Sequence, residues 1–303
     1  MVDARSLTAL GLAAGYALDT ALGDPRRGHP VAAFGRAAGA LERRMWADSR
    51  PRGAAYAAAC VGAAVGLGAV AQAAARKPFA RFVVTALATW AVLGGRGLAR
   101  EGEVMAEFLE ADDLPAARRR LAHLCGRDAT KLDTKELARA ATESIAENTS
   151  DAVVAPLVWG AIAGVPGLLG YRALNTLDAM VGHRSARYER FGWAAARADD
   201  LANLVPARLA ALAATLLGGH PGRTWRVWRR DAAKHPSPNA GPVEAAFAGA
   251  LDIRLGGVNT YGGVTEDRGT LGDGRTPEPA DLRRSVRLSK LVGLAALAVA
   301  VTR

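Results

Sequence analysis

The sequence is poor in cysteine and in aromatic residues. Its 303 residues include only two cysteines, and Phe, Trp and Tyr together make up 6% of the chain. Two cysteines without C-x-x-C spacing form neither a disulfide framework nor a zinc site, so we expect Cys60 and Cys125 to be structural thiols. The P-loop, dinucleotide, zinc-protease and serine-hydrolase fingerprints are also absent. These absences exclude the standard forms of those enzyme classes.

Negative charge is in deficit. The chain has 39 Lys+Arg against 29 Asp+Glu, a formal net charge of +10. We do not predict nucleic-acid binding, because no helix-turn-helix, zinc-finger, RNP or KH motif accompanies the charge and aromatic residues are scarce. Loops that face the surface of a lipid bilayer explain the positive charge better.

Long apolar runs dominate what is present. Half of the residues are hydrophobic, and they gather in stretches rich in Ala, Val, Leu and Gly. A bilayer core about 30 Å thick is crossed by a helix of roughly 20 apolar residues. We predict one membrane-embedded domain over residues 1–303, with candidate membrane segments at 6–23, 53–75, 79–98, 152–171, 201–219 and 288–302. The first is expected to be a retained anchor, because Asp19 interrupts the run that a signal peptide would need.

The segment 152–171 differs from the other apolar runs. It is interrupted by six helix-breaking residues, namely Pro156, Gly160, Gly164, Pro166, Gly167 and Gly170. Irregular backbone occurs at membrane depth where it is buried in protein or lines a cavity. We therefore predict that this segment is broken or re-entrant.

Polar segments separate the apolar runs. Residues 24–52 carry seven Lys/Arg and are expected to be cytoplasmic, and residues 96–150 have the pattern of an amphipathic helical layer. Residues 220–287 contain turn-rich strings, including the glycine-rich stretch 256–263, and no strand alternation long enough for a sheet. The predicted fold is an all-α, polytopic integral membrane bundle with amphipathic helical and loop insertions.

The first polar cluster precedes the interrupted segment. On a helix, Glu143, Glu147 and Asp151 fall at i, i+4 and i+8, so they form one stripe of carboxylates. Such a stripe beside an apolar run favours a bound cation, and magnesium suits all-oxygen ligands. The alternative is a solvated helix face on which Arg139 pairs with Glu143.

Two further polar clusters adjoin apolar runs. The second contains Arg172, Asn175, Asp178, His183 and Arg184, and the third contains Asp199 and Asp200. For the second cluster the alternative is an ordinary amphipathic helix capped by Gly182. For the third it is a pair of acids that interact with the dipole at a helix N-terminus. Ionisable groups recur three times close to the predicted membrane segments, which favours a functional site over a structural one. In such a site the carboxylates would bind magnesium and the basic residues would bind phosphate.

Several ordered strings resemble the adenosylcobinamide-phosphate synthase (CobD/CbiB) family of cobalamin biosynthesis, over about residues 10–265. They are Gly23-Asp-Pro with His29-Pro30, Glu143-Ser-Ile-Ala-Glu-Asn-Thr-Ser-Asp151, Tyr171-Arg-Ala-Leu-Asn-Thr-Leu-Asp-Ala-Met-Val-Gly182, Phe191-Gly-Trp-Ala-Ala-Ala-Arg-Ala-Asp-Asp200 and His235-Pro-Ser-Pro-Asn-Ala-Gly241. The resemblance implies a multi-pass enzyme of the cell membrane. Such an enzyme joins aminopropanol, or its O-phosphate, to the propionate carboxyl of adenosylcobyric acid and consumes ATP, giving adenosylcobinamide or its phosphate.

The implied chemistry agrees with the residue types. ATP would activate the acid, most simply as an acyl phosphate, with Mg²⁺ and arginines stabilising the transferring phosphoryl group. The corrinoid is a substrate in this scheme, and other late cobalamin-pathway enzymes are candidate partners. Because ATP is cytoplasmic, the site is expected to face the cytoplasm. A non-catalytic membrane sensor and a transporter for corrinoids or small solutes are the alternative functions.

We assign roles to the residues of the matching strings as hypotheses. The catalytic candidates are Glu143, Glu147, Asp178 and Asn175. The candidates for binding substrate or phosphate are Arg172, His183, Arg184, Asn148, Asp24, His29, His235 and Asn239. The candidate metal ligands are Glu147, Asp151, Asp199 and Asp200.

Overall fold

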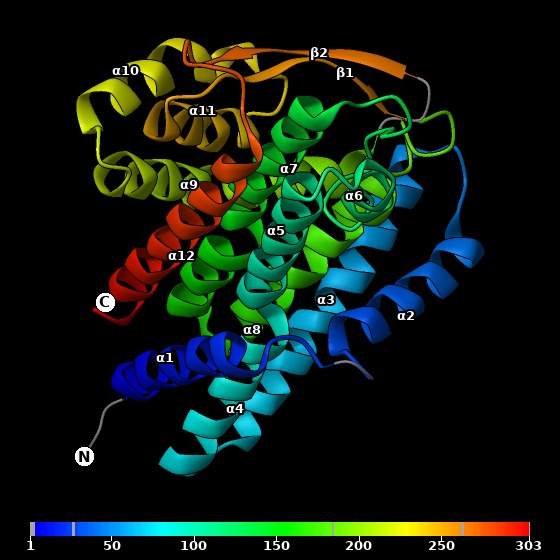
Figure 1. Cartoon of the computed structure of the whole chain (residues 1–303). Helices are drawn as coiled ribbons and strands as arrows, with labels where there is room; N and C mark the ends of the chain where they lie inside the picture. Colours follow the sequence, from blue (N-terminus) through cyan, green and yellow to red (C-terminus); the bar gives the residue numbers. More distant parts are fainter. Residues whose placement is uncertain (1–3, 26–27, 184, 262–263, 303) are drawn as a thin grey trace. The chain divides into compact units, whose positions relative to one another are not determined.

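The computed structural model describes residues 4–25, 28–183, 185–261 and 264–302, and it confirms the predicted all-α class. The α-helices are α1 (Ala4–Leu22), α2 (Pro30–Met45), α3 (Arg50–Ala74), α4 (Pro78–Val92), α5 (Gly95–Glu110), α6 (Leu114–Leu121), α7 (Thr134–Thr149), α8 (Ala155–Leu177), α9 (Trp193–Leu217), α10 (Pro221–Asp231), α11 (Ala240–Leu251) and α12 (Pro279–Val301). Short helical turns of other types are η1 (Ser150–Val154), η2 (Asp178–Gly182) and η3 (Ala232–Lys234). Figure 1 shows their order along the chain.

The chain divides into two compact units. Unit 1 comprises residues 1–94, 155–203 and 297–303, and unit 2 comprises residues 95–154 and 204–296. Each unit is assembled from segments that are distant in the sequence. The single membrane-embedded domain expected from the sequence stays a prediction.

Membrane-spanning character is concentrated in four helical stretches of the described chain. They are Arg50–Ala74, Pro78–Glu110, Thr134–Gly182 and Trp193–Leu217. On α3, large apolar side chains such as Leu67 and Val70 are exposed by 64% and 68%, as expected of a surface that meets lipid. The predicted segments 6–23 and 288–302 form α1 and α12, which are helical but are not among these four stretches.

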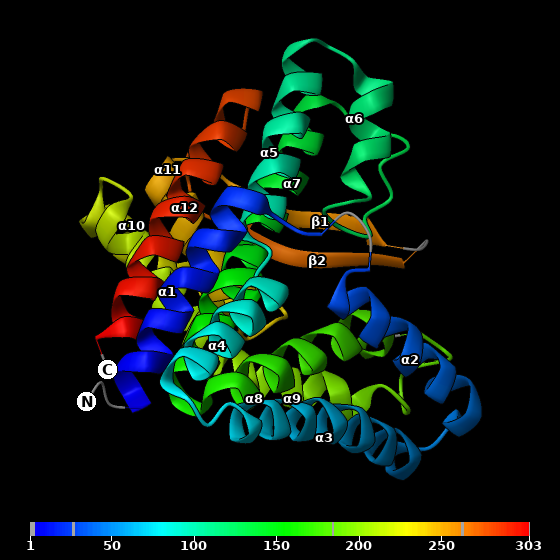
Figure 2. The same ribbon diagram turned by 90° about the horizontal axis from the view of Figure 1, so that it is seen from below.

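Close helix packing organises unit 1. Gly11 and Gly15 of α1 lie against Thr85 and Thr89 of α4, where a Cβ atom at either glycine would overlap the threonine side chain. This is the small-xxx-small spacing that lets helix backbones approach in lipid. In the same unit α3 packs along α8 (Figure 2).

Helix α8 is interrupted at Gly164, within the segment predicted to be broken or re-entrant. Gly164 has φ 64° and ψ −142°, a conformation that favours glycine. The chain folds back there, because Gly160 lies against Leu168 although the two are eight residues apart. The backbone N–H of Val165 donates a hydrogen bond of 3.0 Å to the side-chain oxygen of Gln72 on α3. Helix α3 therefore supplies the hydrogen-bond acceptor for a backbone N–H that loses its helical partner at the break.

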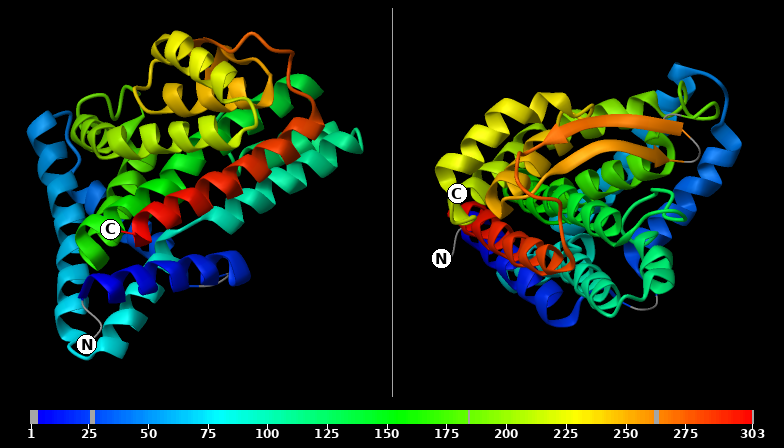
Figure 3. Two further views of the ribbon diagram at one scale, coloured as in Figure 1. Left: turned by 90° about the vertical axis from the view of Figure 1, so that its left-hand side faces the viewer. Right: turned by 45° about the horizontal axis from the view of Figure 1, so that its top comes forward.

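Unit 2 has its own apolar core. Buried side chains from α5, α6, α7 and α12 form it, including Leu109, Leu121, Leu137, Ile145 and Leu282. Their opposite faces are polar, which agrees with the predicted amphipathic layer over residues 96–150. Helices α10 and α11 pack on each other beside the hairpin described next (Figure 3, right).

The prediction that residues 220–287 contain no strands was wrong. Strands β1 (Leu255–Tyr261) and β2 (Val264–Leu271) pair antiparallel, with a register shift between Gly256 and Val258. Gly256 and Gly257 have φ of 81° and 84°. Gly257 lies opposite a bulge in β2, where Arg268 and Gly269 face this single residue, so the glycines that suggest a loop instead belong to the hairpin. Packing of the hairpin against α11 and α7 compensates for its weak strand alternation.

Candidate functional site

Helix α7 places the predicted glutamates in unit 2. Asp133 and Glu136 form a reciprocal capping box that fixes where the helix begins. Glu143 is buried, with 4% of its surface exposed, whereas Glu147 is half-buried one turn later. Asp151 lies beyond the α-helix in the wider π-helical turn η1, so the predicted α-helical stripe ends before it.

Two groups hold the Glu143 carboxylate. The Arg127 guanidinium forms an ion pair with Oε2, and the backbone N–H of Gly256 donates a hydrogen bond of 2.7 Å to Oε1. The alternative interpretation expected Arg139 to pair with Glu143. In the structure Arg139 instead donates a hydrogen bond to the carbonyl oxygen of Gly256. Glu143 therefore fixes the first residues of the hairpin against α7, and its charge is compensated inside the unit.

A buried histidine and a buried glutamate face each other next to α7. His235 follows η3, and Glu244 lies on α11. The His235 Nδ1 accepts a hydrogen bond of 3.0 Å from the backbone N–H of Ser237, so Nε2 carries the proton of the neutral ring. That Nε2 lies 3.6 Å from Oε1 of Glu244, and both side chains are 1% exposed.

Burial shifts the pKa values of this pair in opposite directions. Desolvation and the nearby positive charge of Arg268 lower the pKa of His235 to about 4, so the ring is neutral at pH 7. Desolvation and the negative charges of Glu143 and Glu147 raise the pKa of Glu244 well above its usual range. The pair therefore combines a neutral imidazole with a carboxyl group whose protonated form is favoured, a perturbation typical of functional sites.

The hairpin supplies the third side of this cluster. In the β1–β2 register Asn259 lies opposite Glu266, and Arg268, two residues later, lies 3.2 Å from the Glu266 carboxylate. The positive charge of Arg268 acts on Glu147, His235 and Glu244. We call the residues Arg127, Glu143, Glu147, His235, Glu244, Asn259 and Arg268 the glutamate cluster.

Sequence reasoning identified only part of the glutamate cluster. It selected Glu143, Glu147 and His235 but missed Arg127, Glu244, Asn259 and Arg268. One signal was available for Glu244, because it is the only charged residue in the otherwise apolar α11 sequence AGPVEAAFAGAL. No local pattern marks Arg127 or Arg268, which reach the cluster through tertiary folding.

Unit 1 contains a second polar cluster, built from α8, η2 and α9. The Asn203 side chain donates 2.9 Å to Oδ2 of Asp199, and the Tyr171 hydroxyl donates 2.9 Å to the Asn203 amide oxygen. Asn175 and the charge of Asp178 also act on the Asp199 carboxylate. The structure thus brings three predicted residues together, and we call this group the aspartate cluster.

Gly182 has a specific place beside the aspartate cluster. A Cβ atom at this position would overlap the Asp178 carboxylate, so a glycine is needed for Asp178 to occupy its position. A helix cap at Gly182 was one interpretation of the sequence, and the structure shows this glycine as the neighbour of a candidate catalytic carboxylate.

Other predicted residues have local partners. The His29 Nε2 lies 3.5 Å from Asp24, and its Nδ1 accepts a hydrogen bond from Val31 at the start of α2. The Asn148 amide donates 2.9 Å to the carbonyl oxygen of Ser144. These contacts stabilise a turn and a helix, and substrate binding by Asp24, His29 and Asn148 stays a prediction.

The remaining predicted residues are distributed over both units. The Asn239 side chain accepts 3.0 Å from Arg208 of α9. His183 is exposed and makes an edge contact with the Tyr188 ring, whereas Arg172 is half-buried. Asp200 lies 3.4 Å from Arg197 of its own helix. Arg184 lies outside the described residues.

No metal-binding arrangement of three or more His, Cys, Asp or Glu side chains is found among the described residues. Magnesium nevertheless often uses one or two protein carboxylates together with substrate phosphates. Asp199 offers such a ligand, because it is 8% exposed and its buried Oδ1 has no hydrogen-bond partner in the described chain. The aspartate cluster thus fits a nucleotide-bound magnesium ion better than a closed protein site.

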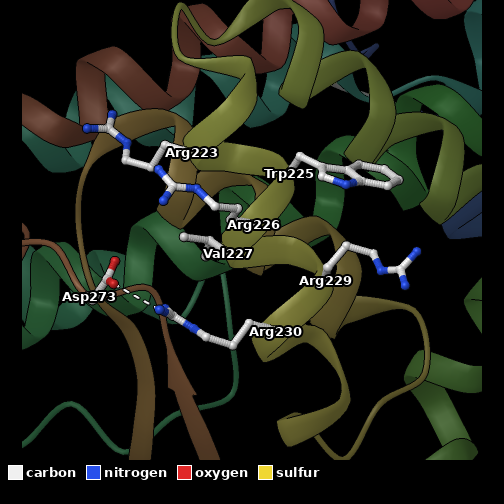
Figure 4. Close-up of a pocket in the computed structure, with 7 residues that line it drawn as sticks. All are labelled: Arg223, Trp225, Arg226, Val227, Arg229, Arg230 and Asp273. Atoms are coloured by element: carbon white, nitrogen blue, oxygen red, sulfur yellow. Dashed lines mark hydrogen bonds and ion pairs between the residues drawn. The ribbon is translucent and has the colours of Figure 1, made fainter.

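A basic recess lies on α10 (Figure 4). It has a volume of about 780 Å³ and is lined mainly by Arg223, Trp225, Arg226, Arg229 and Arg230. Asp252 pairs with Arg223 at 2.9 Å, and Asp273 pairs with Arg230 at 2.9 Å. Within the described residues Arg226 and Arg229 form no ion pair, so this surface suits an anionic group such as a phosphate.

Comparison with known proteins gives one consistent result. The family model described as CobD/Cbib protein matches residues 12–289. The chain is 56% identical over 299 residues to the cobalamin biosynthesis protein CobD of Mycobacterium tuberculosis, covering 97% of this chain and 95% of that protein. It is 46% identical over 282 residues to the protein of the same name from Geobacter metallireducens, covering 89% of each. No solved structure matches.

Proposed function

Because the chain belongs to the CobD/Cbib family of cobalamin biosynthesis proteins, we propose that it is the ligase that attaches an amino alcohol to the corrinoid. In this proposal it joins aminopropanol, or aminopropanol O-phosphate, to the propionate carboxyl of adenosylcobyric acid at the expense of ATP. The relatives' names support a role in cobalamin biosynthesis, and the membrane helices support a membrane enzyme.

The glutamate cluster is the single observation that carries the proposal. Amide formation requires an acid group that is activated, an amine that loses protons and groups that stabilise phosphoryl charge. The cluster combines two arginines, three glutamates and a neutral histidine within unit 2, and several of these groups are buried. Such a concentration of buried ionisable groups is costly for stability and typical of a reaction site.

The proposed reaction and the carboxylates of the aspartate cluster are the reasons for including magnesium and ATP. Bound magnesium would neutralise phosphate charge and orient the nucleotide, with Asp199 and Asp178 as the carboxylates that would hold it. Asn203 orients the Asp199 carboxylate through a hydrogen bond to Oδ2. The basic residues Arg172 and Arg184 are proposed to bind phosphate, and the site is proposed to face the cytoplasm, where ATP is available.

The test is an assay of the detergent-purified protein for product by mass spectrometry. The reaction contains adenosylcobyric acid, ATP, magnesium and either aminopropanol or its phosphate. The parent should form the amide, whereas Glu147→Gln and Asp178→Asn should lose at least tenfold in rate while remaining folded. Absence of product from folded parent protein with verified substrates would overturn the proposal and favour a sensor or transporter.

A further inference from the structure

Five buried polar atoms of the glutamate cluster lack hydrogen-bond partners in the described chain. They are both carboxyl oxygens of Glu244, Nε2 of His235 and the two side-chain amide atoms of Asn259. Glu244 and His235 are 1% exposed at their side chains, and Asn259 is 4% exposed. Unpaired buried polar atoms are rare in proteins, because each loses its hydrogen bonds to water. Glu244 and His235 face each other at 3.6 Å, and Asn259 is buried on β1, which packs against α11, so a polar ligand in this region would give these atoms partners.

The charges of the cluster specify the kind of ligand. The cluster holds three glutamates and two arginines, and Arg268 is itself paired with Glu266 at 3.2 Å. Ionisation of Glu244 would therefore leave an excess of negative charge, which a bound cation would balance. This balance favours a cation over an anion. A primary ammonium group donates three hydrogen bonds and accepts none, which suits the Glu244 oxygens and the Asn259 carbonyl. The neutral His235 Nε2–H can donate to the remaining Glu244 lone pair.

We propose that Glu244, together with Glu147 and Asn259, binds the protonated primary amine of the amino-alcohol substrate and that Glu244 accepts its proton. This assignment rests on the proposed ligase function and names the amine subsite within it. Glu244 is then a catalytic residue, and His235 is a positioning residue that orients it.

The proton transfer balances simply. One N–H bond of the ammonium breaks, its electron pair stays on nitrogen, and the proton moves to an oxygen of Glu244. The freed nitrogen lone pair attacks the carbonyl carbon of a corrinoid acyl phosphate, whose phosphoryl group comes from ATP. The C–N bond forms, the C–O bond to phosphate breaks, and phosphate leaves with the bonding pair. The second amine proton passes to the departing phosphate or to water.

This arrangement links amine binding to proton release. Desolvation and the charges of Glu143 and Glu147 raise the pKa of Glu244, which favours its protonated form in the free protein. The free amine carries its proton as well, as lysine does. The complex holds one proton fewer than these two free species. Affinity should therefore rise about tenfold per pH unit below the pKa of Glu244. The charged and titratable groups that face Glu244 are Glu143, Glu147, His235, Arg268 and Arg127.

Calorimetry on the full-length protein in detergent tests the proposal. Aminopropanol is titrated at pH 7 in two buffers that differ in ionisation enthalpy, and 1,2-propanediol serves as the ligand without an amine. The parent should release one proton per aminopropanol bound. Glu244→Gln should bind at least tenfold more weakly and release none. The control Glu278→Gln, an exposed position in unit 2, should behave like the parent.

The outcomes separate this inference from the proposed function. Aminopropanol binding without proton release in the parent overturns the Glu244 assignment, even if the assay shows amide product. An unchanged affinity and proton count in Glu244→Gln overturns it as well. If that variant does not fold, the proton count of the parent decides. Proton-linked amine binding with no amide product would preserve the subsite and overturn the ligase.

Discussion

The buried ion pair between Arg127 and Glu143 gives the sharpest test of how unit 2 is held together. Their side chains are 3% and 5% exposed, so neither charge is solvated by water. Replacing Arg127 with methionine keeps a long unbranched side chain but removes its charge. Within the described residues, the buried Glu143 carboxylate then retains the Gly256 N–H as its one donor. Removing one partner of a buried pair costs about 3–5 kcal/mol.

Thermal unfolding in detergent measures this loss. With about 2–4 °C per kcal/mol for a domain of this size, Arg127→Met should lower the melting temperature by on the order of 10 °C. The double variant Arg127→Met with Glu143→Gln should recover much of that loss, because neither position then leaves an unpaired buried charge and glutamine can still accept from Gly256.

An exposed pair in the same unit provides the control. Arg283 and Glu110 lie 2.7 Å apart, and their side chains are 37% and 43% exposed. Arg283→Met should cost no more than about 1 kcal/mol, because water solvates the remaining carboxylate. If both single variants melt within a degree of the parent, the argument that burial makes the Arg127–Glu143 pair important is refuted.

Three further predictions concern the break in α8, the buried histidine and the membrane topology. Gln72→Leu should destabilise the protein by about 1–3 kcal/mol, because it leaves the N–H of Val165 unpaired; an unchanged melting temperature would contradict this. The pKa of His235 is about 4 when folded, against about 6.5 when unfolded, so the unfolded chain binds more protons between these values. Stability from this group is present above pH 6.5 and lost as pH falls toward 4; the parent should lose more stability between pH 7 and 5 than His235→Gln, and equal losses would refute the assignment. Cysteines introduced at Lys131 and Glu189, both exposed, should react with an impermeant thiol reagent only from the cytoplasmic side of membrane vesicles; labelling from opposite sides would exclude one cytoplasmic site.

Burial also changes how the topology is best tested. Ser150 adjoins the carboxylate motif and is an obvious labelling site from the sequence, but only 2% of its surface is exposed. A cysteine there would be shielded by protein whichever side of the membrane it faced. Lys131 belongs to the same unit and is exposed, so its reactivity reports the side of the membrane.

The candidate site was predictable where its residues form local motifs. The acidic and amide residues of 143–151 and 171–182 are close in sequence and next to apolar runs, so their helical placement followed from spacing. Arg268 and Asn259 could not be found this way. They belong to a hairpin whose glycines indicate a loop, and only its packing on α11 and α7 brings them to the cluster.

The sequence by itself determined the helical class, the long apolar segments and the motifs of the cobalamin biosynthesis family. These properties depend on short-range patterns, namely run length, helical spacing and turn residues, which are complete within a few tens of residues. Tertiary structure alone decided that Arg127 neutralises Glu143, that Gln72 satisfies the break at Gly164, and that Glu244 faces His235. Each of these contacts joins different elements, and burial there determines which charges are paired and which polar atoms remain for a ligand.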